Sequence, residues 1–229
     1  MALRKLNPLG KTSGKIGNTV SRQRYDKEVV YAKPETVNIS YSKKAVAGRS
    51  KFSFTVRLAR LVNSIPELSA LWKNSKIAGT NAYQKIIKHN SKLTSAYGLT
   101  TRNIITPRGI DTIRNSLTFD SRQIMLKSVF DRPVINCFTS IFILLFLYSE
   151  KENELLLISS MDIRRIEDNS VQGTISLDKS DIEKISRYKK AVILSSFTFE
   201  KDNSGSINWS TTIPLEIGLE AIWGDQNIG

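Results

Sequence analysis

The sequence predicts an α+β protein: a basic N-terminal arm and β-hairpin, a few α-helices, and then an antiparallel β-sandwich of immunoglobulin-like type. Three observations predict this fold. Positive charge is concentrated at the N-terminal end, apolar side chains recur at helical spacing between residues 42 and 90, and short β-branched or aromatic segments follow from about residue 98. The expected domains are a flexible basic arm at 1–15, a hairpin plus helical basic region at 16–97, and a β-sandwich at 98–229.

The charge distribution separates a basic front from an acidic rear. The 229 residues carry a net charge of +13. Residues 1–60 contain 14 Lys and Arg against 3 Asp and Glu, residues 61–133 contain 11 against 4, and residues 134–229 contain 9 against 14. We therefore expect the N-terminal half to face a polyanion or an acidic protein surface.

Cysteine usage and hydropathy indicate the compartment. The single cysteine, Cys137, excludes an intrachain disulfide and fits a reducing compartment. No apolar run follows Arg4 and Lys5, so we expect no signal peptide. The most apolar stretch, residues 134–148, is shorter than the roughly 20 residues of a membrane-spanning helix and predicts a buried strand or strand pair. We expect a soluble protein, cytoplasmic or within a particle assembled there, with no membrane partner.

The first 32 residues predict an arm followed by a hairpin. Residues 1–15 are basic and lack periodicity, which is typical of a flexible arm. The hairpin has its turn at residues 25–27 and its second strand at residues 28–32. In the first strand Val20, Arg22 and Arg24 share one face, because side chains alternate with a period of two. Two guanidinium groups would then lie side by side.

The glycines and cations of residues 10–18 invite comparison with a phosphate-binding P-loop. In that motif a glycine follows the first glycine after four spacer residues, between a strand and a helix. Counting from Gly10, this position is Lys15, and no strand precedes it. Nucleotide hydrolysis is therefore not predicted. The simpler interpretation is that Gly14 and Gly17 allow turns and close packing while the cations are solvated.

This N-terminal segment resembles an uncharacterised family of bacterial and phage-borne proteins of Bacteroidetes type. The resemblance rests on Ser13-Gly14-Lys15-Ile16-Gly17-Asn18, on a strand that ends at Lys33-Pro34, and on Arg49-Ser50-Lys51-Phe52 near the start of a helix. It implies a β-rich C-terminal part and no known activity, so it assigns no catalytic residue.

Residues 42–63 predict an amphipathic helix with a basic face. Its apolar stripe contains Phe54, Leu58, Leu61 and Val62. A second stripe, at i, i+4, i+8 and i+11, consists of Arg49, Ser53, Arg57 and Arg60. Two interpretations stay open for this stripe: a solvated charged face, or a face that contacts a polyanion.

Two further helices are expected before the β-rich part. Ser64 and Glu67 predict a capping box with Pro66 in the first turn, and Gly79 is expected to end that helix. Residues 81–90 predict a third helix, near the end of which stands His89, the single histidine. Metal sites built on histidine need several ligands, so we expect a surface histidine and no metal.

The remainder predicts about seven short antiparallel strands in roughly 110 residues, which is typical of a β-sandwich. The clearest hairpins have turns at residues 150–153 and 202–205. Ser180 and Glu183 predict a capping box for one short helix. The predicted strands lie around residues 117–119, 123–129, 137–148, 155–159, 174–177, 191–200 and 206–213.

The sequence offers no catalytic constellation, metal site or cofactor motif, so an enzyme is not expected. The residues expected to bind a polyanion or partner are all cations: Lys11, Lys15, Arg22, Arg24, Arg49, Arg57 and Arg60. The first functional hypothesis is a structural or assembly protein, such as a component of a phage-like particle, whose arm adds a strand to another protein subunit. The alternative is a nucleic-acid-binding protein that contacts phosphates through its basic half.

Overall fold

The computed structural model describes residues 2–4, 14–16, 19–24, 27–32, 39–119, 122–133, 138–149, 152–167, 169–201 and 206–219. The chain divides into two compact units, residues 1–45 and 46–229. We describe each unit by itself, as a small unit and a large unit.

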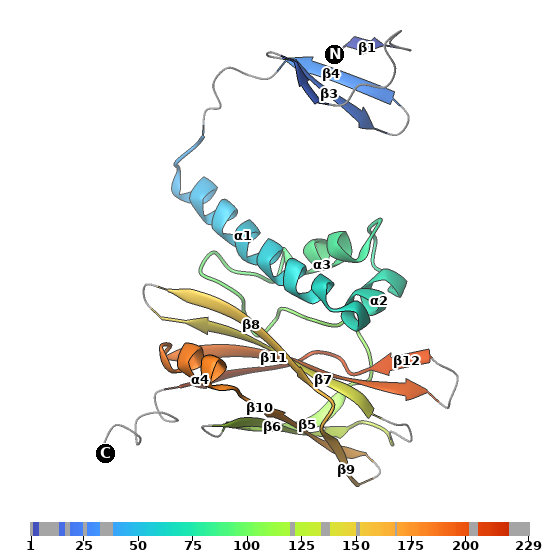
Figure 1. Cartoon of the computed structure of the whole chain (residues 1–229), viewed down its shortest axis with the longest axis vertical. Coiled ribbons are helices and arrows are strands. Elements are labelled where there is room, and N and C mark those ends of the chain that lie inside the picture. Colours follow the sequence, from blue (N-terminus) through green and yellow to red (C-terminus); the bar gives the residue numbers. More distant parts are fainter. Residues whose placement is uncertain are drawn as a thin grey trace. The chain divides into compact units, whose positions relative to one another are not determined.

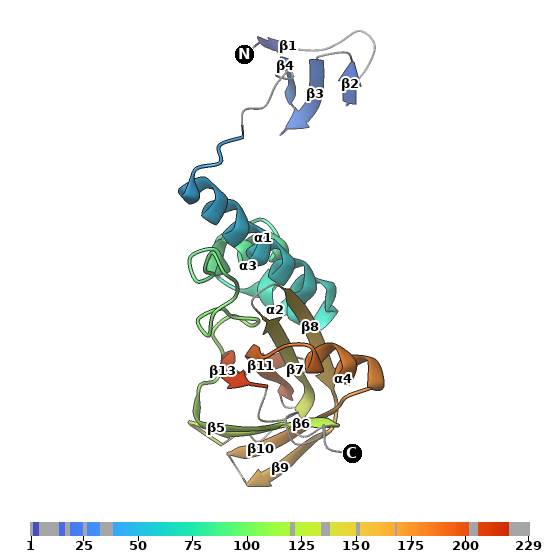
Figure 2. The same cartoon turned by 90° about the vertical axis from the view of Figure 1, so that its left-hand side faces the viewer.

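The small unit contains a four-stranded antiparallel sheet with the order β1-β4-β3-β2 (Figure 2). Its strands are β1 (Ala2–Arg4), β2 (Gly14–Ile16), β3 (Thr19–Arg24) and β4 (Lys27–Ala32). Pairing of β3 with β4 confirms the predicted hairpin, with Arg24 opposite Lys27. The two turn residues between them lie outside the described part of the chain.

The predicted arm is corrected by this sheet. Residues 2–4 pair with β4 and residues 14–16 pair with β3, so both ends of the segment 1–15 belong to strands rather than to an unpaired arm. Strands of three residues carry no detectable periodicity in a sequence, and their backbone hydrogen bonds come from partners that lie elsewhere in the chain. Lys11 lies outside the described residues.

Three helices and the loop after them form one layer of the large unit (Figure 1). The helices are α1 (Lys43–Ser64), α2 (Pro66–Asn74) and α3 (Ala82–Asn90). We call residues 46–110 the helical layer. As predicted, α1 buries an apolar stripe that includes Phe54, Leu58 and Val62, and α2 buries Leu68 and Trp72.

Two antiparallel sheets complete the large unit. The outer sheet has the order β5-β6-β10-β9, and the central sheet has the order β12-β11-β7-β8, with β13 also paired to β11. Their strands are β5 (Thr112–Phe119), β6 (Gln123–Phe130), β7 (Phe138–Tyr148), β8 (Asn153–Ser160), β9 (Ile163–Glu167), β10 (Ser170–Ser176), β11 (Lys190–Lys201), β12 (Ser206–Trp209) and β13 (Ile213–Gly218). One helix, α4 (Lys179–Ser186), connects β10 to β11. The α+β class and the mostly antiparallel sheets agree with the prediction.

The central sheet is buried on both faces. Along β7 the residues at odd positions from Ile141 to Leu147 face the core shared with the outer sheet, whereas Phe142, Leu144 and Phe146 face the core shared with the helices. A strand covered on both faces needs apolar residues at every position. This explains why the predicted apolar run shows no alternation, and its described part confirms a buried strand.

The domain boundary predicted at residue 97 does not separate compact units. Buried residues of α1, α2 and α3 share one hydrophobic core with β7 and β11, so the helices and both sheets form a single unit from residue 46 onward. The loop after α3 is also joined to the central sheet: Ile110 and Trp209 share a backbone hydrogen bond of 2.9 Å, and the amide of Ile105 donates to Thr212 Oγ1 at 3.0 Å. The change near residue 98 from helical spacing to β-branched and aromatic segments therefore marks the end of the helices and not a domain boundary.

Both predicted capping boxes are wrong in their cap residue. Ile65 is the N-cap of α2, and the Ser64 hydroxyl donates to the carbonyl of Leu61 at 2.7 Å. In α4 the cap is Asp178, whose carboxylate accepts from the amide of Asp181 at 2.7 Å. Each chosen serine lies within two residues of the true cap, which is the usual uncertainty of a helix boundary. In addition, α2 ends at Asn74, before the predicted Gly79.

None of the helices in the described part of the chain is long and apolar enough to cross a membrane.

Candidate functional site

The helical layer is the most strongly charged part of the large unit. Residues 46–110 contain 11 Lys and Arg and a single acidic residue, Glu67. The rest of the large unit, residues 111–229, contains 13 Lys and Arg against 17 Asp and Glu. One carboxylate cannot neutralise eleven cations, so this layer has a positive potential of its own.

Helix α1 directs its cations away from the core. Because its buried stripe packs against α2, α3 and the central sheet, the opposite side carries Arg49 and Arg60, both exposed. Arg57 is half-buried, and its Nη1 donates to Asn153 Oδ1 on β8 at 2.7 Å. Of the three arginines predicted on this helix, two therefore lie at the surface and one binds the central sheet.

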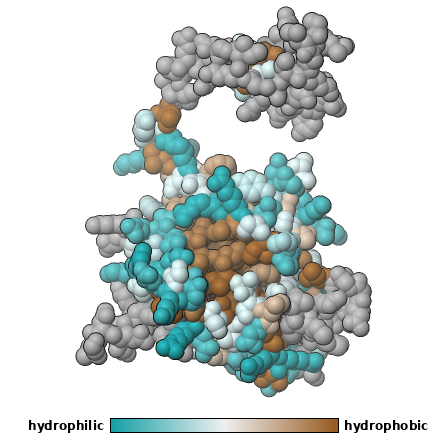
Figure 3. Space-filling view, viewed as in Figure 1, coloured by the Kyte–Doolittle hydropathy of each residue, from teal (hydrophilic) through white to brown (hydrophobic). Residues whose placement is uncertain are grey.

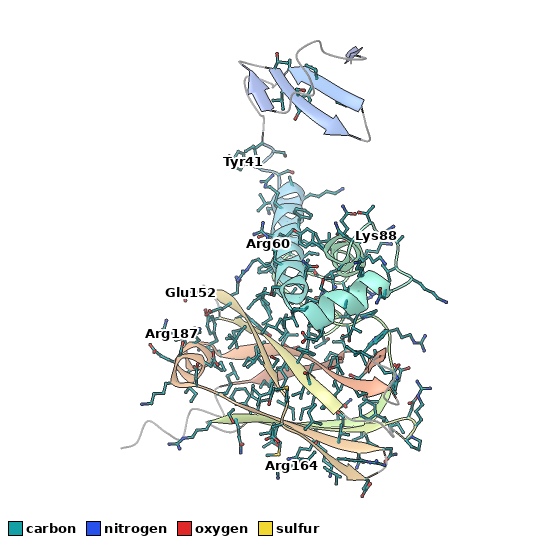
Figure 4. The ribbon with its side chains drawn as sticks, turned by 45° about the vertical axis from the view of Figure 1, so that its right-hand side comes forward. Tyr41, Arg60, Lys88, Glu152, Arg164 and Arg187 are labelled. Carbon is teal, nitrogen blue, oxygen red and sulfur yellow. The ribbon has the colours of Figure 1, made fainter. Side chains whose placement is uncertain are left out.

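Other exposed cations extend this surface onto α2, α3 and the loops around them. These cations were not among the predicted binding residues, because they do not follow one another at regular helical spacing. The signal that would have identified them is the near absence of acidic residues between 46 and 110. Figure 4 labels Arg60 on α1 and Lys88 on α3, both in the layer of helices above the sheets. The exposed cations of the layer beyond α1 are Lys73, Lys76, Lys88, Lys92, Arg102 and Arg108.

Lys85 is the buried exception among these cations. Its Nζ donates to the carbonyl of Lys73 at 2.8 Å and to that of Ser75 at 2.6 Å, where α2 ends. Carbonyl groups at the end of a helix lack intrahelical donors and carry partial negative charge, so an ammonium group is favourable there. We therefore assign Lys85 to holding α2 and α3 together and exclude it from the binding surface.

The predicted residues of the small unit are placed only in part. Lys15 lies in β2, and Arg22 and Arg24 lie two positions apart in β3, as expected for one face of a strand. Nothing is described of these three side chains. They belong to the small unit, whereas Arg49, Arg57 and Arg60 belong to the large unit.

Two aromatic side chains are exposed in the helical layer. Tyr97, in the loop after α3, is 93% exposed, and Phe52 on α1 is 58% exposed. Apolar rings in contact with water are unfavourable unless a partner covers them, and single exposed rings are also common on protein surfaces. Both rings lie in the layer that carries the exposed cations.

His89 is exposed on one side, and its ring lies edge-on to the buried ring of Trp72, with ring centroids 6.1 Å apart. Burial against these neighbours lowers the pKa of His89 below its ordinary value. Within the described residues, no group of three His, Cys, Asp or Glu side chains is arranged to hold a metal ion. Cys137 lies outside the described residues.

No protein-family model matches the chain, and none of the curated proteins has a significantly similar sequence.

Proposed function

We propose that the protein is a non-enzymatic nucleic-acid-binding protein that contacts phosphates through its helical layer. The observation that supports this is the eleven-to-one ratio of cations to carboxylates in residues 46–110, with eight of those cations exposed. Such a layer attracts a polyanion because binding releases the counterions condensed along the phosphate backbone. This is the second of the two functions expected from the sequence.

We prefer this function because the small unit differs from the free N-terminal arm that the sequence predicted. Assembly through a strand-adding arm needs free strand-forming residues at the N-terminus. Residues 2–4 and 14–16 are instead paired with β4 and β3 of their own sheet. The arm therefore supports assembly less than the sequence suggested, whereas the helical layer keeps the positive charge that the sequence predicted.

Charge reversal at two sites tests the proposal. The double variant Arg60→Glu and Lys88→Glu reverses exposed cations on two helices, and the control Arg164→Glu and Arg187→Glu makes the same charge change outside the helical layer (Figure 4). Fluorescence anisotropy with a labelled duplex, from about 50 to 200 mM salt, measures affinity and its salt dependence.

We expect the helical-layer variant to bind at least about tenfold more weakly and to lower the log–log salt slope by about two, because each lost phosphate contact removes about 0.9. The control should lose far less, and both variants should keep the unfolding temperature of the parent. Equal losses in the two variants would mean that only net charge matters and would contradict a specific surface.

A second function, self-assembly, is favoured by one edge of the central sheet. β8 pairs with β7 along its length, and no other strand pairs with it in the described part of the chain. Its four central residues are apolar and half-buried: Leu155 and Leu157 adjoin the helical core, and Leu156 and Ile158 adjoin the core between the sheets. Figure 3 shows an apolar area on the face where β8 lies in Figure 1.

A strand added at this edge would need apolar residues on both of its faces, and a second copy of β8 provides them. If two copies pair antiparallel with Leu157 opposite Leu157 of the other copy, directly opposed residues share one face of the sheet. Leu156 then lies opposite Ile158, and Leu155 lies opposite Ser159, so apolar residues meet on both faces. One edge of the outer sheet is different, because β9 carries Arg164, Arg165 and Glu167 and so resists strand addition.

Light scattering on the eluate of a size-exclusion column tests this second function. We expect a dimer or larger species whose amount rises with concentration and falls for Ser159→Lys, because a lysine on an edge strand opposes pairing. Ile113→Lys, at an exposed position of β5, is the matched control. A monomer at every concentration would exclude assembly through β8.

We also propose a more specific architecture for the two sheets of the large unit. Two antiparallel sheets with one shared core support a β-sandwich, and we propose the immunoglobulin-like arrangement expected from the strand pattern. A role in a multi-subunit assembly such as a phage-like particle is compatible with either function, because both use surfaces rather than a catalytic site.

A further inference from the structure

We propose that the helical layer binds single-stranded nucleic acid and stacks a base on Tyr97. This inference rests on the proposed nucleic-acid function and specifies its ligand. Tyr97 is the most exposed large apolar or aromatic side chain among the described residues, at 93%. Buried hydrogen bonds hold the backbone of the loop that carries it.

A buried polar network fixes the loop that carries Tyr97. Asn103 Nδ2 donates to Asn90 Oδ1 at 3.0 Å and to Thr94 Oγ1 at 2.9 Å, and Thr55 Oγ1 on α1 donates to Thr94 Oγ1 at 3.2 Å. Asn90, Asn103, Thr94 and Thr55 are all buried. Satisfied buried networks restrict a chain to one arrangement, so the loop is attached rigidly to α1 and α3.

The turn at residues 95–98 then places Tyr97 at its tip. The Ser95 hydroxyl accepts from the amide of Tyr97 at 3.1 Å and from that of Gly98 at 3.0 Å. Gly98 has φ +151°, and a Cβ there would overlap the ring of Phe146 on β7, so only glycine fits. The backbone is therefore fixed on both sides of an aromatic ring that contacts mainly water.

Exposed cations occur in the loop that carries Tyr97 and on the helix that this loop contacts. Lys92 and Arg102 are exposed in the same loop. The hydroxyl of Ser50 on α1 donates to the carbonyl of Ala96 at 2.6 Å, which brings the loop beside the helix next to Arg49. Tyr97 is thus an aromatic platform within a surface that attracts phosphates.

This combination discriminates between single and double strands. In a duplex the bases are stacked on each other and cannot cover a protein ring, whereas an unpaired base can stack on an aromatic side chain while its phosphates contact cations. Holding the ring in place before binding reduces the entropy lost on binding. Cations alone would bind both forms of nucleic acid.

The test compares four probes: a single-stranded pyrimidine oligomer of about 20 nucleotides as DNA and as RNA, the corresponding duplex, and an abasic oligomer with the same number of phosphates. Fluorescence anisotropy measures the affinity of the full chain, of Tyr97→Ala and of Tyr97→Phe. Met161→Ala is the control, since Met161 is 83% exposed outside the helical layer.

We expect Tyr97→Ala to weaken binding of the single strands by about 5- to 150-fold, the range for loss of one stacked base. Its affinity for the duplex and the abasic oligomer should stay within about twofold, and Tyr97→Phe and Met161→Ala should resemble the parent, because a phenyl ring still stacks.

Two results would overturn the inference. If Tyr97→Ala binds all probes as the parent does, or loses affinity for duplex and abasic oligomers equally, Tyr97 stacks no base, while charge reversal on the helical layer can still reduce binding and leave the proposed function intact. If the parent binds no probe better than the Arg60→Glu and Lys88→Glu variant, both the proposed function and this inference fail.

Discussion

The helical layer and the outer sheet cover opposite faces of the same central sheet, yet they differ in charge. The helical layer has eleven cations and one carboxylate, whereas the remainder of the large unit has an excess of acidic residues. Both layers bury apolar residues against β7 and β11 in the same way. Burial on the inner side of each layer therefore stabilises the fold, and it does not determine the charge of the exposed side.

This difference separates stability from binding. Repulsion among exposed like charges slightly lowers the stability of the folded state. The accumulation of cations on the helical layer therefore does not stabilise the fold. Contacts at the boundary between the layers should control stability, while the exposed cations should control binding. A substitution that changed stability and binding together would break this separation.

Gly98→Ala should disrupt the boundary between the helical layer and the central sheet. A methyl group would overlap the Phe146 ring, and φ +151° is unfavourable for any residue with a side chain. We expect the free energy of unfolding to fall by about 2–5 kcal/mol, from backbone strain and overpacking together, as measured by urea denaturation.

The control for this prediction is Gly48→Ala. Gly48 lies within α1, and a Cβ there meets no atom within 4 Å. Alanine should therefore raise the stability by about 0.5–1 kcal/mol, because glycine is a poor helix former. An unchanged or raised stability of Gly98→Ala would show that glycine is not needed at the boundary.

Lys85→Met should have an intermediate effect. Methionine keeps much of the apolar stem but cannot donate to the carbonyls of Lys73 and Ser75, so we expect a loss of about 2 kcal/mol in the free energy of unfolding. Lys88→Met, one turn later and exposed, should change stability by less than about 0.5 kcal/mol.

The same pair of variants separates binding from stability. Lys88→Met should weaken nucleic-acid binding, whereas Lys85→Met should leave the affinity of the folded protein unchanged. The opposite pattern in the anisotropy measurement would place Lys85 in the binding surface and Lys88 outside it.

The smallest expected effect is the titration of His89. Burial lowers its pKa in the folded protein, so the unfolded chain binds the proton more readily. The stability that this histidine contributes is therefore present above its ordinary value of 6.5 and decreases as the pH falls through 6.5 toward the folded pKa. Since His89 is the single histidine, its imidazole signals can be followed by NMR without assignment.

His89→Gln should abolish this pH dependence, and an ordinary or raised pKa would contradict the contact with Trp72. Because the histidine is partly exposed, the accompanying change in stability should be small compared with those of Gly98 and Lys85.

Patterns of neighbouring residues predicted several elements correctly. The period of 3.6 residues identified α1 to within one residue at each end and its apolar stripe, and alternation with turn residues identified the β3–β4, β7–β8 and β11–β12 hairpins. The strand β9 was missed because its residues from Arg164 to Glu167 are all exposed and show no alternation. An edge strand with one partner does not need the apolar side chains that make strands recognisable.

The sequence by itself determined the α+β class, the basic front and the basic outer side of α1, since each depends on charge or on contacts within a few residues. Only the tertiary structure decided that residues 2–4 and 14–16 pair within a sheet and that the helices share a core with β7. It also decided that Tyr97 is exposed at the tip of a hydrogen-bonded turn. These features arise from hydrogen bonds and packing between residues far apart in the chain. Their energies depend on which distant partners meet, and local residue patterns do not record that.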